Sequence, residues 1–227
     1  MEKKNQKKKI GVVLSGCGVY DGTEIQEAVL SLLAIDQKDW EAVCIAPNIN
    51  QHEVINHLNG EIDTTHRNVL EESARIARGK IKNLSTFTAE DYAELDALWF
   101  PGGFGAAKNL SHWAFLGAQT LVIDEIKNSI IYFIQHKKPI VSLCISPVLI
   151  AKVAQDLNIE PVLTLGSDEK AETELKKTGA KIAEVKSIAI DETYKIISVP
   201  CYMQDLTPKT IFEQITEATE QLEKWWK

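Results

Sequence analysis

Short apolar runs alternate with longer amphipathic segments from one end of the chain to the other. Four of the apolar runs have the length and composition of buried strands: 9–14, 42–46, 95–100 and 140–143. Three of the amphipathic segments have helical periodicity: 23–36, 68–78 and 121–136. This alternation predicts a mainly parallel sheet that is covered by helices on both faces. We expect one α/β domain over residues 1–227, because a chain of 227 residues with 44% hydrophobic content can form a single large core.

The last third of the chain continues this pattern less regularly. Strands are predicted at 162–165, 181–185 and 195–199, and helices at 171–178 and 210–226. The first helix is expected to be capped by Thr23 and to carry Ile25, Val29, Leu32 and Leu33 on one side.

Charge and cysteine content limit the classes of partner. The net charge of -7 argues against nucleic acid, and the lysines of residues 1–8 are expected to form a mobile, solvated tail. No apolar run is long enough to span a bilayer or to form the core of a secretory signal, so no membrane partner is expected. The four cysteines, Cys17, Cys44, Cys144 and Cys201, lack metal-type pairing. They suit reduced thiols without disulfides in the cytoplasm.

Three loops lie where ligands bind open parallel sheets, beyond the carboxyl ends of the strands. They are 15–22, 101–105 and 144–146. The glycine spacing in the first loop matches neither a dinucleotide fingerprint nor a P-loop, so it indicates nucleotide binding only weakly. In the second loop, the bare backbone at Gly102 and Gly103 offers N–H groups to an oxyanion, but a tight turn that only glycine makes explains it equally well.

Cys144 stands where a buried strand meets the start of a helix. Residues 140–143 are apolar, and Ser146 followed by Pro147 is typical of an N-cap and a first helical residue. Unpaired backbone N–H groups and the positive end of the helix dipole favour a thiolate at this position. Cys144 is therefore predicted to be a nucleophile. The alternative is a buried cysteine that acts as a small apolar residue.

Glu24 is the first candidate for a proton-transfer group, because it lies at the start of the first helix near the predicted thiol. A carboxyl group poised by burial moves protons to and from a substrate. Its alternative role is to stabilise the dipole of its own helix.

The positions of the histidines separate possible mechanisms. All five precede Cys144 in the sequence, and none shows metal-ligand spacing: His52, His57, His66, His112 and His136. The lack of a downstream histidine argues against glutamine hydrolysis and against a peptidase with a Cys-His couple. Neither a metal nor another cofactor is expected.

Several motifs together resemble the ElbB family, whose members are glyoxalase-like, are associated with isoprenoid biosynthesis, and have a class I glutamine amidotransferase-like domain. They are Ser-Gly-Cys-Gly-Val-Tyr-Asp-Gly-Thr-Glu ending at Glu24, Val-Ile-Asn-His-Leu ending at Leu58, Pro-Gly-Gly-Phe-Gly-Ala-Ala-Lys-Asn-Leu ending at Leu110, and the Cys144 segment. The similarity runs nearly from end to end. It implies a flavodoxin-like three-layer sandwich with a mainly parallel sheet.

The resemblance also implies roles for particular residues. Cys144 is the expected nucleophile and Glu24 its carboxyl partner, with oxyanion donors near Gly103 and Ile145. The candidate oxyanion and substrate-binding residues are Gly102, Gly103, Ile145, Cys17 and Gly18. A homodimer is also implied. The chain departs from relatives in this family at Gln26, where they have histidine, so no imidazole role is expected there.

The leading hypothesis is a cofactor-independent glyoxalase that converts small dicarbonyls, glyoxal or methylglyoxal, to hydroxy acids through the Cys144 thiolate. One alternative is a redox-responsive or binding protein with little turnover, in which Cys17 resolves an oxidised Cys144. Another is a hydrolase of amides or glycated side chains that uses the same cysteine.

Overall fold

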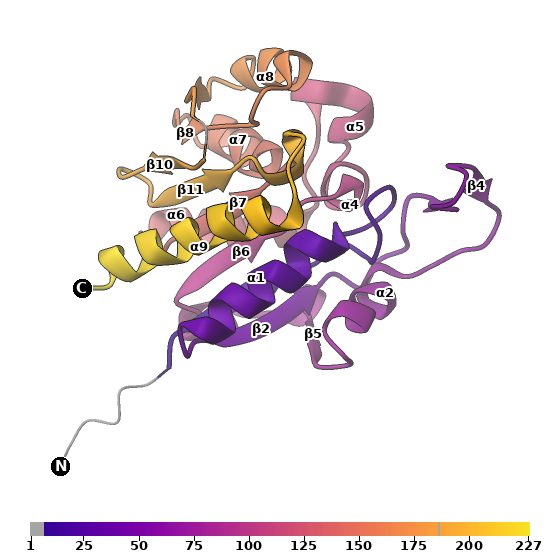
Figure 1. The fold of residues 1–227 in the computed structure, drawn as a ribbon, viewed down its shortest axis with the longest axis horizontal. Coiled ribbons are helices and arrows are strands. Elements are labelled where there is room, and N and C mark those ends of the chain that lie inside the picture. The colour runs from indigo at the N-terminus through magenta and orange to yellow at the C-terminus, as the bar shows by residue number, and fades with distance from the viewer. Residues whose placement is uncertain (1–6, 186) are drawn as a thin grey trace.

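A seven-stranded sheet forms the middle layer of the computed structural model, which describes residues 7–185 and 187–227 (Figure 1). The strand order is β10-β11-β7-β6-β1-β2-β5. The strands are β1 Lys9–Val13, β2 Glu41–Ala46, β5 Ile81–Asn83, β6 Ala97–Phe100, β7 Ile140–Leu143, β10 Ala189–Asp191 and β11 Ile196–Val199. Neighbouring strands are parallel except for the β10–β11 pair.

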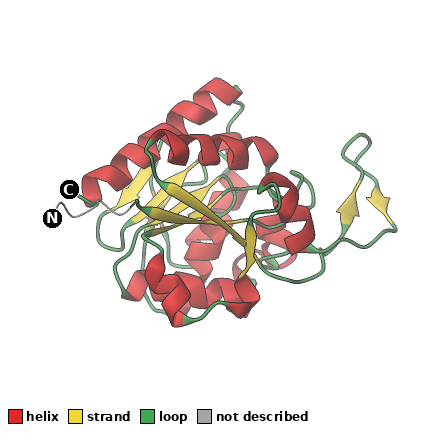
Figure 2. Ribbon diagram, turned by 90° about the horizontal axis from the view of Figure 1, so that it is seen from below, coloured by secondary structure: helices red, strands yellow, loops and turns green. Residues whose placement is uncertain are grey.

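Helices cover both faces of the sheet, as Figure 2 shows from below. They are α1 Ile25–Gln37, α2 Val69–Ile76, α3 Ala89–Glu94, α4 Phe104–Lys108, α5 Trp113–Leu116, α6 Asp124–Gln135, α7 Pro147–Asp156, α8 Glu169–Lys176 and α9 Pro208–Trp225. Alternate residues of each strand face opposite layers. In β6, Leu98 and Phe100 pack in the core with α6 and α7, whereas Ala97 and Trp99 pack in the core with α1 and α9. The predicted three-layer, flavodoxin-like α/β sandwich is therefore confirmed.

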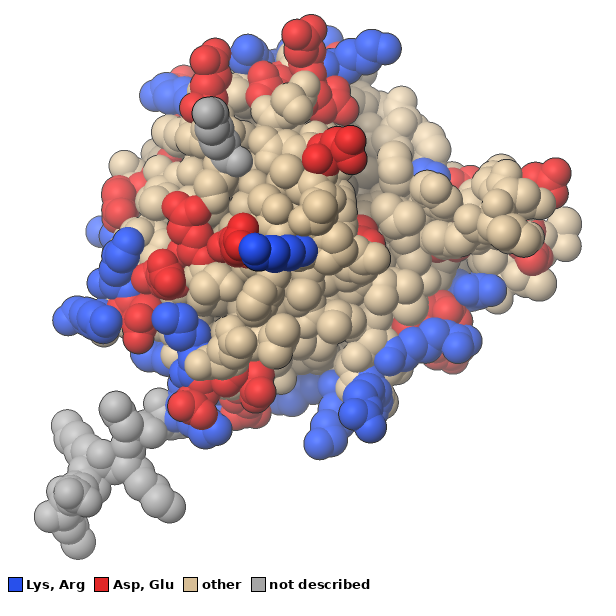
Figure 3. Space-filling view, viewed as in Figure 1, with Lys and Arg blue, Asp and Glu red and all other residues tan. Residues whose placement is uncertain are grey.

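The first helix differs from its prediction at both its start and its exposed side. The N-cap is Glu24, whose carboxyl group accepts the Glu27 backbone N–H at 2.6 Å. Thr23 is buried and does not cap the helix, because its hydroxyl oxygen accepts the Ser15 backbone N–H at 2.7 Å. Ile25, Val29 and Leu33 are exposed to solvent, while Ala28, Ala34 and Ile35 of α1 are buried in the core. The space-filling view from this side is largely uncharged over α1, with acidic and basic groups around it (Figure 3).

A two-stranded hairpin projects from the body of the molecule (Figure 2). It consists of β3 Val54–Ile55 and β4 Ile62–Asp63, which pair antiparallel in the segment after β2. A second small sheet pairs β8 Val162–Leu163 with β9 Lys181–Ile182. The strands predicted at 162–165 and 181–185 are thus shorter in the structure, and they pair with each other outside the central sheet.

Most of the expected N-terminal tail lies outside the described residues. Within the described part, Lys8 forms an ion pair with Asp96 at 2.8 Å. No helix in residues 7–185 or 187–227 combines the length and the hydrophobicity needed to cross a membrane.

Candidate active site

Cys144 occupies the turn between β7 and α7. Its φ is +56°, a left-handed conformation that costs a non-glycine residue about 1–2 kcal/mol. The Cys144 N–H donates to the carbonyl of Val199 on the neighbouring strand at 2.8 Å, which holds this turn on the sheet. Ser146 precedes α7 as predicted but does not cap it with its side chain, because its hydroxyl donates to the Pro101 carbonyl at 2.7 Å.

Gly102 allows the loop after β6 to approach Cys144 closely. A Cβ atom on Gly102 would lie 2.6 Å from Glu27 Oε2 and would also overlap the Cβ atom of Cys144. The next residue, Gly103, has a φ of +97°, and a Cβ atom there would collide with the backbone at Glu24. Both glycines are therefore required by the close contact of this loop with α1 and with the turn at Cys144.

Two backbone N–H groups face the sulfur of Cys144. They belong to Gly103 and Ile145, and both lower the pKa of the thiol by hydrogen bonding. Donors in this arrangement also suit an oxyanion that forms on a carbon bonded to the sulfur. The structure thus brings Gly103, Ile145 and Cys144 together.

Glu27, which the sequence analysis did not select, is the carboxyl group beside the sulfur. Its side chain is fully buried and is hydrogen-bonded to Cys144. Oε2 accepts the Gly102 N–H at 2.8 Å, and Oε1 accepts the Tyr202 N–H at 3.3 Å. Burial raises the pKa of Glu27 to about 8, with a further contribution from the negative charge of Glu24.

The thiol itself is harder to ionise than the sequence suggested. Burial and then the charge of Glu27 raise the pKa of Cys144 well above its ordinary value, and these effects exceed those of the two N–H groups. The prediction of a thiolate favoured at rest is therefore wrong. The carboxylate form of Glu27 can instead accept the thiol proton when the sulfur reacts.

A cavity of about 350 Å³ opens onto Cys144. Glu24 lines this cavity from the start of α1, and Phe104, Asp168, Tyr202 and Met203 complete most of its wall. Its carboxyl groups belong to Glu24 and Asp168, and no lysine, arginine or histidine is among the described residues that line it. Glu24 thus lies at the site but does not occupy the position of Glu27. The cavity favours a neutral or cationic ligand over an anion.

Cys17 and Gly18 lie on a loop against which side chains from other parts of the protein pack. A Cβ atom on Gly18 would lie 2.6 Å from the ring of His57, and Cys17 lies near Glu72 and Arg75. Burial and the charge of Glu72 raise the pKa of Cys17. Val19 is the residue of this loop that lines the cavity. The structure therefore does not bring Cys17 and Gly18, two of the candidate substrate-binding residues, to Cys144.

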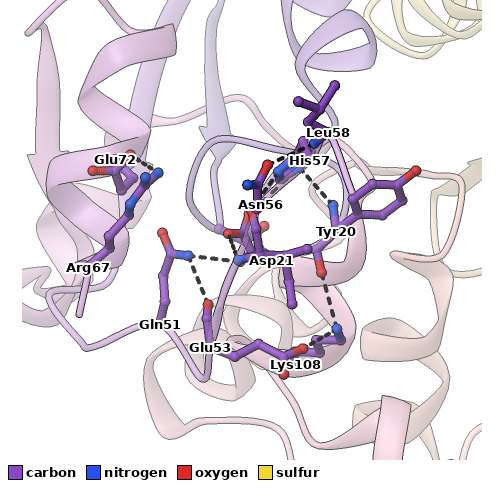
Figure 4. Close-up of polar contacts among 12 residues, drawn as sticks. Tyr20, Asp21, Gln51, Glu53, Asn56, His57, Leu58, Arg67, Glu72 and Lys108 are labelled. Atoms are coloured by element: carbon purple, nitrogen blue, oxygen red, sulfur yellow. Dashed lines mark hydrogen bonds and ion pairs between the residues drawn. The ribbon is translucent and has the colours of Figure 1, made fainter. Parts of the chain in front are cut away.

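The base of the projecting hairpin clamps this glycine-rich loop (Figure 4). Asp21 is buried and accepts the Ile55 N–H at 2.8 Å. The His57 ring stacks on Tyr20 with its centroid at 4.8 Å, and Nε2 accepts the Tyr20 N–H at 3.2 Å. Lys108 pairs with Glu53 on the other side of the loop. Because the ring of His57 fills the space beside Gly18, close packing explains the glycine at this position.

Cys201, and not Cys17, is the thiol beside Cys144. It follows β11, the strand next to β7, and both cysteines belong to the same buried cluster. Burial, then Glu27, then Cys144 raise the pKa of Cys201. The resolving role predicted for Cys17 therefore has a nearer candidate in Cys201.

The sequence contained a signal for the residues that were missed. Glu27 lies one helical turn after Glu24, so the two carboxyl groups share one side of α1. Tyr202 and Met203 directly follow Cys201 at the carboxyl end of a predicted strand, where ligand-binding residues are expected. Among the described residues, no group of three or more His, Cys, Asp or Glu side chains is arranged to hold a metal ion.

Comparisons with known proteins agree with the observed fold. The chain is 41% identical over 208 residues to the rat protein named ES1 protein homolog, mitochondrial, and equally to the human glutamine amidotransferase-like class 1 domain-containing protein 3, mitochondrial; each match covers 86% of this chain and 75% of the relative. A solved structure from Ehrlichia chaffeensis is described as an isoprenoid biosynthesis protein with an amidotransferase-like domain. It shares 32% identity at a TM-score of 0.87 and covers 96% of this chain and 99% of its own. No family model matches the sequence.

The names of the relatives correct the expected location. The rat, human and zebrafish relatives are all named as mitochondrial proteins, which contradicts the cytoplasmic prediction. That prediction depended on scattered reduced cysteines, which do not distinguish the cytoplasm from other reducing compartments.

Proposed function

The chain belongs to the ES1 and ElbB family of class I glutamine amidotransferase-like proteins, and from this premise we propose that it is a cofactor-independent glyoxalase. Glyoxal and methylglyoxal are the proposed substrates, and glycolate and lactate are the products. One observation carries the proposal. A cysteine that faces two backbone N–H groups and a buried carboxyl group opens onto a cavity.

In the first step, the sulfur of Cys144 bonds to the aldehyde carbon of the dicarbonyl. The carboxylate form of Glu27 accepts the thiol proton as this bond forms, since the two side chains are already hydrogen-bonded. The aldehyde oxygen takes the electron pair of the broken carbonyl bond. The N–H groups of Gly103 and Ile145 stabilise the resulting alkoxide, which becomes a hemithioacetal on protonation.

In the second step, the proton on the former aldehyde carbon moves to the neighbouring carbon by way of an enediol. Glu24 is the proposed shuttle, because its carboxyl group lines the cavity. The former aldehyde carbon is oxidised to a thioester while the neighbouring carbonyl is reduced to an alcohol, so no external oxidant is needed. Water then cleaves the carbon–sulfur bond, the thiol regains its proton, and the hydroxy acid leaves.

The charge of the cavity favours release of the product. The substrates are neutral, whereas the hydroxy acid product is an anion. Glu24 and Asp168 line the cavity, and they repel the product after the thioester is hydrolysed.

Purified protein tests the proposal directly. Methylglyoxal is supplied without glutathione, and lactate is measured by NMR for the wild type, Cys144→Ala and Cys44→Ala. Cys44 lies in β2 and is the matched control, because it is buried in the same core but is not among the residues that line the cavity. We expect lactate from the wild type and Cys44→Ala and about a thousandfold less from Cys144→Ala. Equal activity in all three proteins would refute the proposal.

A second candidate, removal of dicarbonyl adducts from glycated side chains, is favoured by the two carboxyl groups at the cavity. A glycated arginine keeps a positive charge, which Glu24 and Asp168 attract. Rates on free methylglyoxal and on a glycated arginine peptide decide between the two. A higher kcat/KM for the peptide would make the glyoxalase reaction secondary.

A further inference from the structure

A second hollow, of about 490 Å³, adjoins the cavity at Cys144. Phe104 and Ile145 line both spaces, so these two side chains form the boundary between them. The far walls of the groove come from α5, which supplies Trp113 and Leu116, and from α8, which supplies Ala171 together with the charged residues Lys170 and Glu174. We call this second hollow the aromatic groove.

The aromatic groove holds an unusual concentration of exposed apolar side chains. Phe104, Phe115 and Leu116 all line it, and they are 47%, 51% and 49% exposed. Large apolar side chains that gather around a hollow and remain open to water mark a ligand-binding surface. Single exposed residues of this size would need no explanation.

Contacts with the surrounding elements hold the walls of the groove in place. The Phe104 N–H donates to the Val19 carbonyl at 2.7 Å, and the Ala118 N–H donates to Glu174 at 3.2 Å, which ties the end of α5 to α8. The ring of Phe115 contacts that of His52 with centroids 4.5 Å apart. The groove is therefore formed before any ligand arrives.

We infer that the aromatic groove binds an apolar arm of the substrate, so that the carbonyl compound attacked by Cys144 carries an alkyl or aryl chain. This inference rests on the proposed function, because Cys144 must be the reacting group. A dicarbonyl as small as glyoxal fills little of a 350 Å³ cavity and none of the groove beyond it. An attached chain extends past Phe104 and Ile145 and buries apolar surface against Trp113 and Leu116.

Alkylation of Cys144 tests the groove without requiring turnover. The protein is treated at about pH 9 with N-methyliodoacetamide or with N-octyliodoacetamide, and labelling rates are measured by peptide mass spectrometry. Cys17, which is partly exposed and lies on another loop, is the internal reference for the intrinsic reactivity of each reagent. We expect the octyl reagent to be favoured at Cys144 at least about tenfold over its preference at Cys17, since even two buried methylenes contribute that much.

A pair of matched variants distinguishes binding of the octyl chain in the groove from a general effect of surface hydrophobicity on labelling. Leu116→Lys places a charge in the groove, whereas Leu121→Lys makes the same change at a side chain that is 66% exposed and is not among the residues lining the groove. We expect Leu116→Lys to reduce the octyl preference to less than about threefold and Leu121→Lys to retain it. Circular dichroism of both variants checks that each one folds.

The outcomes separate the inference from the proposed function. An octyl preference that is equal at Cys144 and Cys17, or that survives in Leu116→Lys, overturns the inference even if methylglyoxal is converted. A preference that Leu116→Lys removes supports the groove even if no dicarbonyl is converted, in which case the glyoxalase proposal alone fails. If neither reagent labels Cys144 even when the pH is raised further to ionise the thiol, the sulfur is inaccessible and both fail.

Discussion

Two cysteines follow neighbouring strands of the sheet in similar backbone conformations, yet their surroundings differ. Cys144 after β7 has a φ of +56°, and Cys201 after β11 has a φ of +43°. Cys144 is 8% exposed and borders a cavity, whereas Cys201 is fully buried and its N–H donates to Gln214 at 3.1 Å. Burial raises the pKa of both thiols. Position on the sheet therefore does not by itself define a nucleophile; access to a cavity and polar partners at the sulfur also contribute.

The largest expected difference between the two cysteines is in their rates of alkylation in the native state. Iodoacetamide should label Cys144 about a thousandfold faster than Cys201, because Cys201 becomes accessible only when the structure opens. Peptide mass spectrometry over a time course measures both rates in one sample. In denaturant the two rates should become similar. Fast labelling of Cys201 in the native state would contradict the expected difference in accessibility between the two cysteines.

The pH dependence of that labelling also tests the corrected ionisation of Cys144. Because burial and Glu27 raise the pKa of this thiol, the half-point of alkylation should lie above the ordinary value of about 8.5. A half-point below that value would show that the thiolate is favoured, as the sequence predicted.

Glu27 is expected to make stability depend strongly on pH. Its pKa rises from 4.5 in the unfolded chain to about 8 in the folded protein, so the folded state holds a proton that the unfolded state releases. At about 1.4 kcal/mol for each unit, the free energy of unfolding should fall by up to about 5 kcal/mol as the pH rises from 4.5 to 8. Glu27→Gln should lack this decline, which urea denaturation at several pH values measures. Parallel pH curves for the two proteins would contradict the raised pKa.

The same group sets the expected pH profile of turnover. The carboxylate form of Glu27 accepts the thiol proton, so activity should increase as the pH rises through about 8. Glu27→Gln should lower kcat/KM about a hundredfold and lose this increase. Glu24→Gln is the matched variant, because it changes a neighbouring carboxyl group that lines the cavity; it should lower kcat/KM as well but keep an increase with pH. An increase near pH 8 that persists in Glu27→Gln would assign the proton to another group.

Much of this arrangement could be predicted from the sequence, because it depends on local pattern. The strand at 140–143, the turn at Cys144 and the glycines at 102 and 103 each carry a signature of composition or spacing. Glu27 was missed because its role comes from tertiary contacts: Gly102 and Tyr202, which are far apart in the sequence, both donate to its carboxyl group. The thiolate was wrongly predicted for a related reason. Dipoles and N–H groups are visible in a sequence pattern, whereas the degree of burial that outweighs them is not.

The smallest expected effect is that of Cys201→Ala. This change should cost about 1 kcal/mol of stability, because it removes one buried sulfur from a packed cluster. It should change kcat/KM by less than about threefold, since Cys201 is not among the residues that line the cavity. Steady-state rates and urea denaturation measure the two effects. If Cys201→Ala lost activity as fully as Cys144→Ala while its stability stayed near that of the wild type, the two thiols would act as a pair, and the buried cysteine would then be part of the chemistry despite its lack of access to the cavity.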